Sequence, residues 1–230
     1  MHKIPVLVVD DFFEDPYAIR DYALSLKYNK TDGVYPGVRS ELLNEVNPVF
    51  FNDFSLRLFS LLFDFRVHGA GGYVEACFQL ITEDYQEGWV HSDLSSDDWS
   101  MAGVIYLTPD APLAGGTSLY RLKSNINPPE NKLKQDFYNN NPVNLDTYKL
   151  QRNAFNECYE RTLEVGNVFN RLVMYNTSQF HKGDTFFGNS LHTGRLTLVF
   201  FAKINMSDNV STPIERMQDY KITEIKYGTT

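Results

Sequence analysis

The sequence predicts a mainly β fold, a two-sheet sandwich or jelly roll, with helices packed against it. From Tyr73 onward, short β-branched and aromatic runs are separated by Gly, Pro, Asn and Asp, which is typical of antiparallel sandwiches. Before that point, two Asx-Pro pairs each precede apolar residues at helical spacing. A chain of 230 residues can bury roughly 70–75% of its unfolded surface, so its core requires no disulfide.

Residues 1–72 are predicted to form an N-terminal strand and supporting helices. The first apolar run, IPVLVVDDFF, indicates a buried strand. Asp15 and Pro16 suit the N-cap and first position of a helix, and Asn47 and Pro48 repeat the device before a second one. Between the two helices, YPGVRS has turn chemistry, and its Arg39 is expected at the surface.

Residues 73–204 are predicted to form the β core. Its strands are expected at Tyr73 to Ile81, Trp89 to His91, Met101 to Leu107, Ser118 to Leu122, Arg171 to Tyr175, Asp184 to Phe187 and Arg195 to Ile204. A polar, Asn-rich insertion at about 123–159 interrupts this rhythm and carries one expected helix, Leu145 to Tyr159. Such an insertion is either a lid or binding loop or a solvated excursion. Residues 205–230 form a C-terminal extension of what we expect to be one domain, 1–230.

The composition excludes several classes of protein. The net charge is −8 with no Lys/Arg cluster, which argues against a nucleic-acid partner. The two cysteines are not in a CxxC pair, so a reducing compartment is expected. No apolar run is long enough for a membrane span. We therefore expect a soluble, cytoplasmic protein, and the sequence gives no information on its oligomeric state.

His91 and Asp93 are the first candidate metal ligands. In an extended chain, residues two apart point to the same side, so this imidazole and this carboxylate would face one metal ion. They are two thirds of a facial triad that leaves the opposite face of the metal open. The site needs a second histidine from elsewhere in the chain.

Four other histidines are available. His2 is terminal and His68 lies beside a Gly-rich turn, so both are expected to be structural. His181 follows the strand RLVMY across a short polar turn, where a ligand can reach across a sandwich. His192 and Arg195 would face opposite sides of a continuous strand. We therefore prefer His181 to His192 as the third ligand.

Two longer segments carry a resemblance to a known family. HSDLSSDDWSMAGVIYLTPDAPLAGGTSLYR contains His-x-Asp, a strand ending in Tyr-Leu, a turn, and Gly-Gly before the next strand. Further on, NRLVMYNTSQFHKG leads to His181 and RLTLVFF begins with Arg195. In order and spacing these segments resemble the prolyl 4-hydroxylase-type 2-oxoglutarate/Fe(II) dioxygenases over residues 91–203.

The resemblance implies a fold, a metal site and an activity. The fold would be a double-stranded β-helix, a cupin-like jelly roll with an all-β core and flanking helices. The iron ligands would be His91, Asp93 and His181. The enzyme would hydroxylate an unactivated C–H bond and decarboxylate 2-oxoglutarate to succinate, using Fe(II), 2-oxoglutarate and O2, with ascorbate a candidate reductant.

Three further residues are predicted to bind the co-substrate. The resemblance implies that Arg195 holds the distal carboxylate of 2-oxoglutarate, and an arginine fork matches such a group bidentately. Thr197 lies on the same strand face and can donate a hydroxyl hydrogen bond to that carboxylate. Tyr106 matches a tyrosine that contacts it in some relatives, although a packed core aromatic is an equal interpretation.

Several alternatives stay open. The separation from His181 to Arg195 is longer than is common in the family, so His192 is either a bystander or a neighbour of the substrate or metal. A cupin-type metal site with non-oxygenase chemistry is a second candidate, which Arg195 and Thr197 argue against. A non-catalytic binding module is a third. The substrate, whether a prolyl residue, an amino acid or a small metabolite, depends on loops such as 123–159, for which the sequence gives no code.

Overall fold

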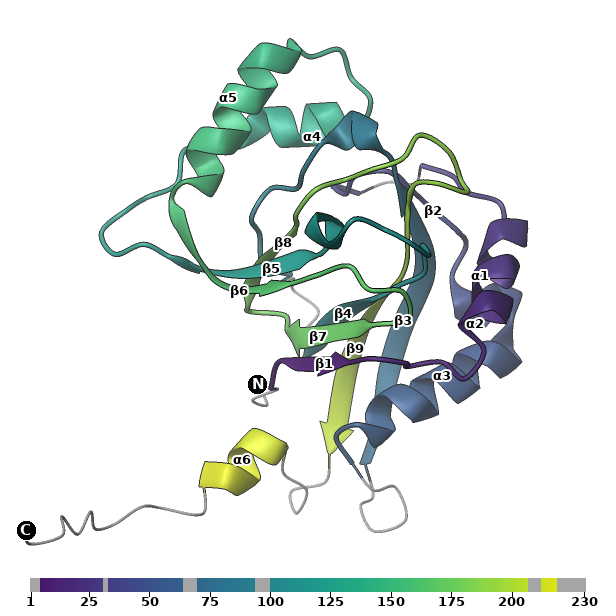
Figure 1. Ribbon diagram of the computed structural model, residues 1–230. Helices are drawn as coiled ribbons and strands as arrows, with labels where there is room; N and C mark the ends of the chain where they lie inside the picture. The colour runs from purple at the N-terminus through teal and green to yellow at the C-terminus, as the bar shows by residue number, and fades with distance from the viewer. Residues whose placement is uncertain (1–4, 31–32, 64–69, 94–99, 207–211, 219–230) are drawn as a thin grey trace, which may run out of the picture.

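The computed structural model describes residues 5–30, 33–63, 70–93, 100–206 and 212–218. In this part of the chain the strands form two antiparallel sheets (Figure 1). The larger sheet has the order β1-β7-β4-β9-β3-β2, with bounds Leu7–Val9, Leu172–Asn176, Met101–Tyr106, Arg195–Met206, Ala70–Ile81 and Val38–Arg39. The smaller sheet has the order β6-β5-β8, with bounds Tyr159–Val165, Thr117–Leu122 and Phe180–Gly183. The prediction of a mainly β protein with helices is confirmed.

The larger sheet has two different faces because side chains alternate along each strand. On β9, Leu196 and Leu198 face the helices and are fully buried with Phe54. Arg195 and Val199, on the other face, line a cavity between the two sheets. The sequence RLTLVFF therefore contributes to the hydrophobic core with one set of residues and to the cavity with the other.

Helices α1 (Pro16–Ser25), α2 (Leu43–Val46) and α3 (Pro48–Ser60) cover the outer face of the larger sheet (Figure 1). The predicted caps are confirmed: the Asp15 side chain accepts a hydrogen bond from the Ala18 amide, and the Asn47 side chain accepts one from the Phe50 amide. These carboxylate and amide oxygens satisfy N–H groups that a helix start leaves unpaired. The packing matches the prediction of N-terminal helices on the outer face of one sheet.

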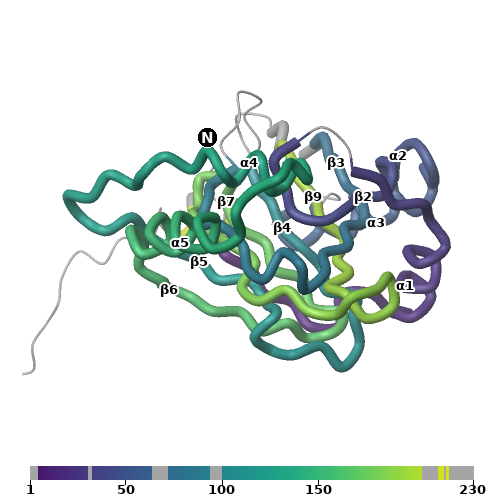
Figure 2. The backbone as a smooth tube through the Cα atoms, turned by 90° about the horizontal axis from the view of Figure 1, so that it is seen from above, coloured from purple at the N-terminus to yellow at the C-terminus, as the bar shows by residue number. Residues whose placement is uncertain are grey.

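The insertion after β5 folds onto the smaller sheet. It contains α4 (Lys132–Tyr138) and α5 (Leu145–Asn156), which lie at the opposite end of the molecule from α1 to α3 (Figures 1 and 2). Tyr138, Tyr148 and Phe155 of these helices are buried with Trp89 in a second hydrophobic cluster. The insertion is therefore not a solvated excursion, because its helices have buried residues of their own.

Several predicted elements differ from the structure. Residues 89–91 form no strand and make a single bridge from His91 to His181. The strand expected at 184–187 lies at Phe180–Gly183 instead, and the insertion helix ends at Asn156, three residues before the predicted end. Sequence reasoning missed β2, α2, α4 and β6. These are short elements that tertiary contacts stabilise, so local patterns indicate them weakly.

The end of the chain adds a short helix, α6 (Pro213–Gln218), within the expected C-terminal extension. Among the described helices, none combines the length and the apolar character that crossing a membrane requires.

Asn170 joins the N-terminal segment to the larger sheet. Its side-chain oxygen accepts a hydrogen bond from the Phe13 amide and its side-chain nitrogen donates one to the Phe13 carbonyl, both at 2.8 Å. Asn170 is buried and has a left-handed backbone φ of 65°, a conformation that Asn tolerates better than most residues. The Asn170 side chain thus makes the pair of hydrogen bonds that a backbone residue would make in an antiparallel sheet, just before β7 begins.

We expect Asn170→Ala to lower the free energy of unfolding by about 2–4 kcal/mol, since it leaves buried backbone groups unpaired and puts alanine at a left-handed φ. Denaturant unfolding measures the loss. Asn125→Ala is the control, because Asn125 is exposed, has a φ of 60° and makes no side-chain hydrogen bond to described residues. An equal loss in both variants would show that the backbone conformation, and not the hydrogen bonds, is responsible.

Candidate metal centre

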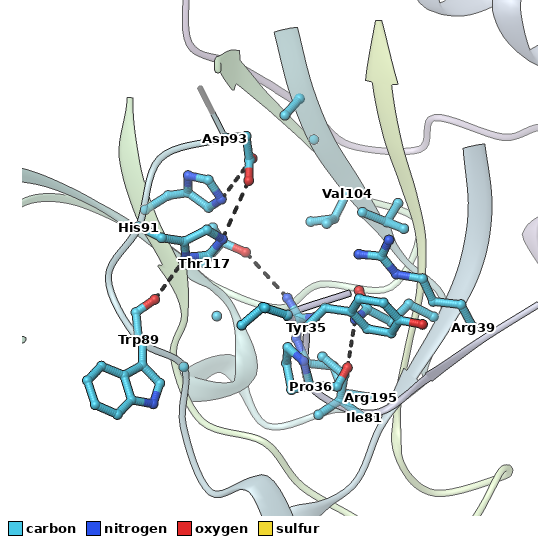
Figure 3. A pocket seen from close by; sticks show the side chains of 18 of the residues that line it. Tyr35, Pro36, Arg39, Ile81, Trp89, His91, Asp93, Val104, Thr117 and Arg195 are labelled. Atoms are coloured by element: carbon cyan, nitrogen blue, oxygen red, sulfur yellow. Dashed lines mark hydrogen bonds and ion pairs between the residues drawn. The ribbon is translucent and has the colours of Figure 1, made fainter. Parts of the chain in front are cut away.

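A cavity of about 260 Å³ lies between the two sheets. Its wall includes parts of β3, β4 and β9 from the larger sheet, β8 from the smaller one, and α4 from the insertion. The charged side chains that line it are Arg39, Asp93, Lys134 and Arg195, together with the imidazoles of His91 and His181. Figure 3 shows His91 and Asp93 on one side of this cavity and Arg39 on the other.

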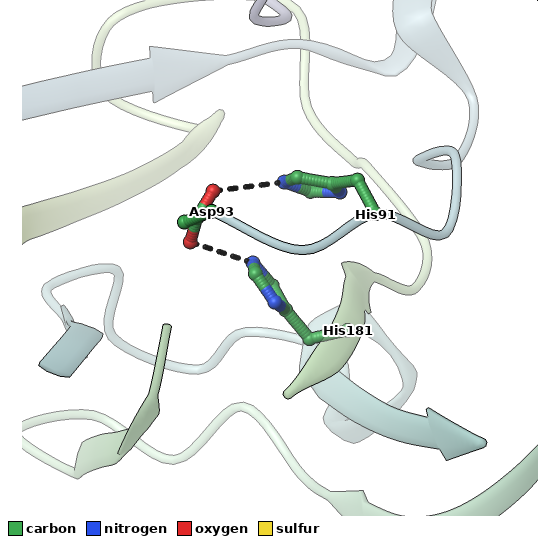
Figure 4. A group of neighbouring side chains, drawn as sticks. All are labelled: His91, Asp93 and His181. Atoms are coloured by element: carbon green, nitrogen blue, oxygen red, sulfur yellow. Dashed lines mark ion pairs between the residues drawn. The ribbon is translucent and has the colours of Figure 1, made fainter. Parts of the chain in front are cut away.

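The structure brings His91, Asp93 and His181 together at one end of the cavity. Their ligand atoms all lie within 4.8 Å of one another. The Asp93 carboxylate lies between the two rings, with its oxygens 3.6 Å from His91 Nε2 and 3.3 Å from His181 Nε2 (Figure 4). Two imidazole nitrogens and one carboxylate oxygen that converge in this way form a donor set suited to a divalent transition metal.

Backbone hydrogen bonds hold the three residues in place. The His91 amide donates to the His181 carbonyl at 3.0 Å, and the His181 amide donates to the His91 carbonyl at 2.8 Å. The Asp93 amide donates to the Thr177 carbonyl at 2.9 Å, which ties Asp93 to the turn before β8. The segment that carries the His-x-Asp motif is thus paired with the strand that carries the distal histidine.

Both histidine rings are oriented in the same way. His91 Nδ1 lies 2.9 Å from the Trp89 carbonyl, and His181 Nδ1 lies 2.9 Å from the Gln179 carbonyl. A carbonyl only accepts hydrogen bonds, so each Nδ1 carries a proton, and Nε2, the ring atom that faces Asp93, is the one available to a metal ion. This arrangement prepares both rings as metal ligands.

The protein environment also favours an unprotonated ligand at His91. Desolvation by the surrounding protein holds the pKa of His91 well below its usual value, and the neighbouring His181 and Lys134 lower it further. Burial lowers the pKa of Lys134 to about 8, against the opposing influence of Asp93. The neutral form of His91 is the form that binds metal.

Arg195 is buried in the same cavity, with 3% of its surface exposed. Its Nε donates to the Gly115 carbonyl at 2.9 Å, and one terminal nitrogen lies 3.4 Å from the Thr117 hydroxyl. Its guanidinium lies 5.3 Å from the centre of the Tyr106 ring. No described carboxylate lies within ion-pair distance of it, and a buried arginine without an acidic partner is unusual unless an anion binds there.

Tyr106 and Thr197 are both fully buried beside Arg195. The Tyr106 hydroxyl donates to the Thr117 hydroxyl at 2.8 Å, and burial raises the pKa of Tyr106, so the ring stays protonated. The Thr197 hydroxyl is directed at the Gln79 carbonyl of the adjacent strand, at 3.5 Å. The roles of both residues in co-substrate binding stay predictions.

The remaining histidines do not join the cluster in the described structure. The side chain of His192 is exposed, and its backbone carbonyl accepts a hydrogen bond from Arg20 at 2.7 Å. His2 and His68 lie outside the described residues. Among the described residues the cluster therefore contains His181 and not His192, and which of the two binds a metal stays a prediction.

Sequence reasoning missed three residues that line the cavity. Arg39, expected at the surface, is half-buried on β2 and faces the cavity. Lys134 comes from α4, and Thr117 accepts the hydrogen bond of Tyr106. A weak signal for Thr117 was the preceding Gly115-Gly116, since a Cβ on Gly116 would lie 1.9 Å from the Val165 carbonyl oxygen. No local pattern marks Arg39 or Lys134.

The insertion supports the metal-binding segment directly. The Asn156 side chain at the end of α5 accepts a hydrogen bond from the Val90 amide at 2.8 Å and donates one to the Gly88 carbonyl at 3.0 Å. The Trp89 indole donates to the Tyr148 hydroxyl at 2.9 Å. The three residues before His91 are therefore each fixed to α5.

Two ion pairs join the same parts of the chain. Arg152 of α5, which is buried, lies 3.0 Å from one carboxylate oxygen of Glu87. Lys182, next to His181, pairs with the other oxygen. Glu87 thus links the insertion to both histidine-bearing segments.

Comparison with solved structures identifies the fold. The chain is similar to HygX from Streptomyces hygroscopicus with nickel and 2-oxoglutarate bound, at 15% identity and a TM-score of 0.52, over 90% of this chain and 84% of that one. HygX with nickel, 2-oxoglutarate and hygromycin B bound gives a TM-score of 0.53 at the same identity and coverage. A prolyl hydroxylase from Trichoplax adhaerens, in complex with a hypoxia inducible factor peptide, matches at 9% identity and a TM-score of 0.48, over 86% and 82% of the chains.

The resemblance to 2-oxoglutarate/Fe(II) dioxygenases is thereby confirmed at the level of the fold. By sequence, the chain belongs to DUF6445, a family of unknown function, whose match covers residues 1–202. No curated protein matches the sequence significantly.

We expect Asn156→Ala to weaken Mn(II) binding about ten-fold, because it releases the backbone that holds His91, and loss of supporting contacts costs metal sites about 10–100-fold in affinity. Electron paramagnetic resonance of free Mn(II) measures the affinity. Asn153→Ala, on the exposed side of α5, is the matched control. Unchanged metal affinity in Asn156→Ala would show that α5 does not position the ligand.

Proposed function

We propose that this protein is a 2-oxoglutarate- and Fe(II)-dependent dioxygenase built on a double-stranded β-helix. One observation carries the proposal. A two-histidine, one-carboxylate cluster and a buried arginine that has no acidic partner among the described residues line the same cavity. A metal ion and a small dicarboxylate would satisfy both features together.

The residues present fit a divalent iron ion. His91, Asp93 and His181 would hold it, with both Nε2 atoms free to bind and the carboxylate between them. Three ligands on one side leave the other coordination positions for co-substrate and O2. The fixed Nδ1 hydrogen bonds mean that neither ring has to reorient when the metal binds.

The residues also fit 2-oxoglutarate. Arg195 is held by Gly115 and Thr117 and keeps donors free for an anion. Thr117 and Tyr106 add hydroxyl groups beside the guanidinium. The similarity in fold to HygX, whose solved structure contains 2-oxoglutarate, supports the same conclusion.

The protein's contribution to the reaction is position and shielding. Fe(II), 2-oxoglutarate and O2, when bound, supply the chemistry that hydroxylates a C–H bond and releases succinate and CO2. Around them, Tyr175 packs on the His181 ring at 4.4 Å between ring centres and is itself buried. Burial raises the pKa of Tyr175 well above its usual value, so it stays a neutral wall that excludes water.

The substrate is a small molecule or a peptide that enters the same cavity. Lys134 and Tyr138 of the insertion line it, which supports a role for the insertion in substrate choice. A cupin-type metal site without oxygenase chemistry is the second candidate. A cupin-type site gives no reason for a buried Arg195 that lines the same cavity and has no ion pair with any described carboxylate.

His181→Ala should weaken Fe(II) binding by more than about 100-fold, because it removes a metal ligand. Removing only a residue that hydrogen-bonds to a ligand already lowers metal affinity about 10–100-fold. Anaerobic equilibrium dialysis measures the affinity. His192→Ala is the control and should bind iron normally, since the His192 side chain is exposed. The opposite result would make His192 the third ligand.

Arg195→Ala should weaken 2-oxoglutarate binding by about 10–100-fold, the effect of losing a charged hydrogen-bond partner. Anaerobic titration of the Fe(II) protein follows the weak visible band of the iron chelate. Arg121→Ala, which removes an exposed arginine, should leave the affinity unchanged. If the wild-type protein gives no band, or if Arg195→Ala binds 2-oxoglutarate normally, the protein is not a dioxygenase of this type.

A further inference from the structure

Arg39 is brought to the cavity by a sharp turn that the fold requires. Gly37 has a φ of 74°, and a Cβ there would lie 2.0 Å from the Leu80 carbonyl oxygen, so only glycine allows the chain to approach β3 this closely. The Gln79 side chain donates to the Pro36 carbonyl at 2.8 Å and holds the turn against the sheet. β2 then pairs with β3, with Arg39 opposite Gln79.

The Arg39 side chain is fixed but not neutralised. Its guanidinium stacks on the Tyr35 ring, 3.9 Å from the ring centre (Figure 3). Its Nε is buried and has no hydrogen-bond partner among the described residues. No described carboxylate forms an ion pair with it. An oriented guanidinium with an unsatisfied donor is suited to bind an anion.

Lys134 gives the same cavity a second free cation. It reaches the cavity from α4, on the insertion, whereas Arg39 comes from the N-terminal region. Lys134 makes no ion pair with any described residue. Asp93 carries the opposite charge and attracts it over a longer distance. Two segments far apart in the sequence thus each place a positive charge in one cavity of an acidic protein.

Among the described residues, the charges that line the cavity do not balance without a further anion. Fe(II) with Asp93 and Arg195 would carry two positive charges, and the 2-oxoglutarate dianion would neutralise both. Arg39 and Lys134 then remain, and Asp93 is the only carboxylate among the described residues that line the cavity. Uncompensated charge in a partly desolvated cavity is costly unless a ligand balances it.

We propose that the substrate of this enzyme carries an anionic group, a carboxylate or a phosphate, and that Arg39 and Lys134 bind this group. The inference rests on the proposed dioxygenase function, because Arg195 and the metal must be assigned to 2-oxoglutarate first. The anionic group would be held inside the cavity, with Arg39 on the side opposite His91 and Asp93 (Figure 3) and Lys134 within electrostatic range of both. The C–H bond that reacts is then the part of the molecule turned toward the metal ligands.

The test uses the protein loaded with Mn(II) and saturating 2-oxoglutarate. The probes are N-acetylglycine, methyl phosphate and the neutral N-acetylglycinamide, and proton relaxation caused by Mn(II) reports their binding near the metal. The variants are Arg39→Gln, Lys134→Gln and Arg39→Lys, with Arg121→Gln as the matched control. Thermal unfolding and the anaerobic Fe(II)–2-oxoglutarate band are recorded for every variant, so that a folding defect is recognised.

We expect an anionic probe to bind to the wild type and Arg121→Gln, and the neutral amide to bind more weakly. Arg39→Gln and Lys134→Gln should each weaken anion binding about ten-fold, and Arg39→Lys should recover part of the loss. The stronger of the two anionic probes distinguishes a carboxylate from a phosphate substrate.

Two results would overturn the inference. In the first, the iron band forms, but anions bind to the folded Arg39→Gln and Lys134→Gln variants as tightly as to the wild type, or bind the wild type no more tightly than the amide does. The anion site is then wrong, and the dioxygenase proposal stands. If the wild type gives no iron band, the dioxygenase proposal fails and the inference fails with it.

Discussion

A pair of reciprocal backbone hydrogen bonds, between His91 and His181, determines whether the candidate metal ligands of this protein come together. The two residues are far apart in the sequence, and neither segment alone places three ligand atoms together. The bridge joins the extended segment after Trp89 to β8, and each ring is then oriented by a carbonyl two residues earlier in its own segment. Asp93 is placed by a further backbone bond to Thr177. The side-chain geometry of the cluster therefore follows from main-chain pairing.

This dependence gives the insertion its importance. Residues 88–90 form no regular strand, and of their amides only that of Gly88 is bonded to β8, at the Gly183 carbonyl. Asn156, Tyr148 and the Glu87 ion pairs supply further support from α5 and from Lys182. The insertion also carries Lys134 into the cavity. One segment thus both stabilises the ligand-bearing chain and shapes the space where a substrate would bind.

Charge is distributed unevenly in the molecule. The whole chain has a net charge of −8, yet, histidines aside, three of the four ionisable Arg, Lys and Asp side chains among the described residues that line the cavity are basic. The interior therefore favours small anions although the protein as a whole is acidic. Arg195, deep in the cavity, and Arg39, on the opposite side from the metal ligands, suit two different anions.

The sequence by itself determined the features that depend on local chemistry and strand alternation. Asx-Pro pairs indicated two helices, strand alternation placed Thr197 on the same face as Arg195, and the His-x-Asp motif together with His181 indicated the cluster. Only the tertiary structure decided that 89–91 is held by a single bridge, that α4 and β6 form, and that Arg39 faces the cavity. The physical reason is that these features depend on contacts between distant segments. Gly37 approaches Leu80, α5 packs on Trp89, and Arg39 is positioned by pairing with β3, none of which leaves a periodic pattern in the chain.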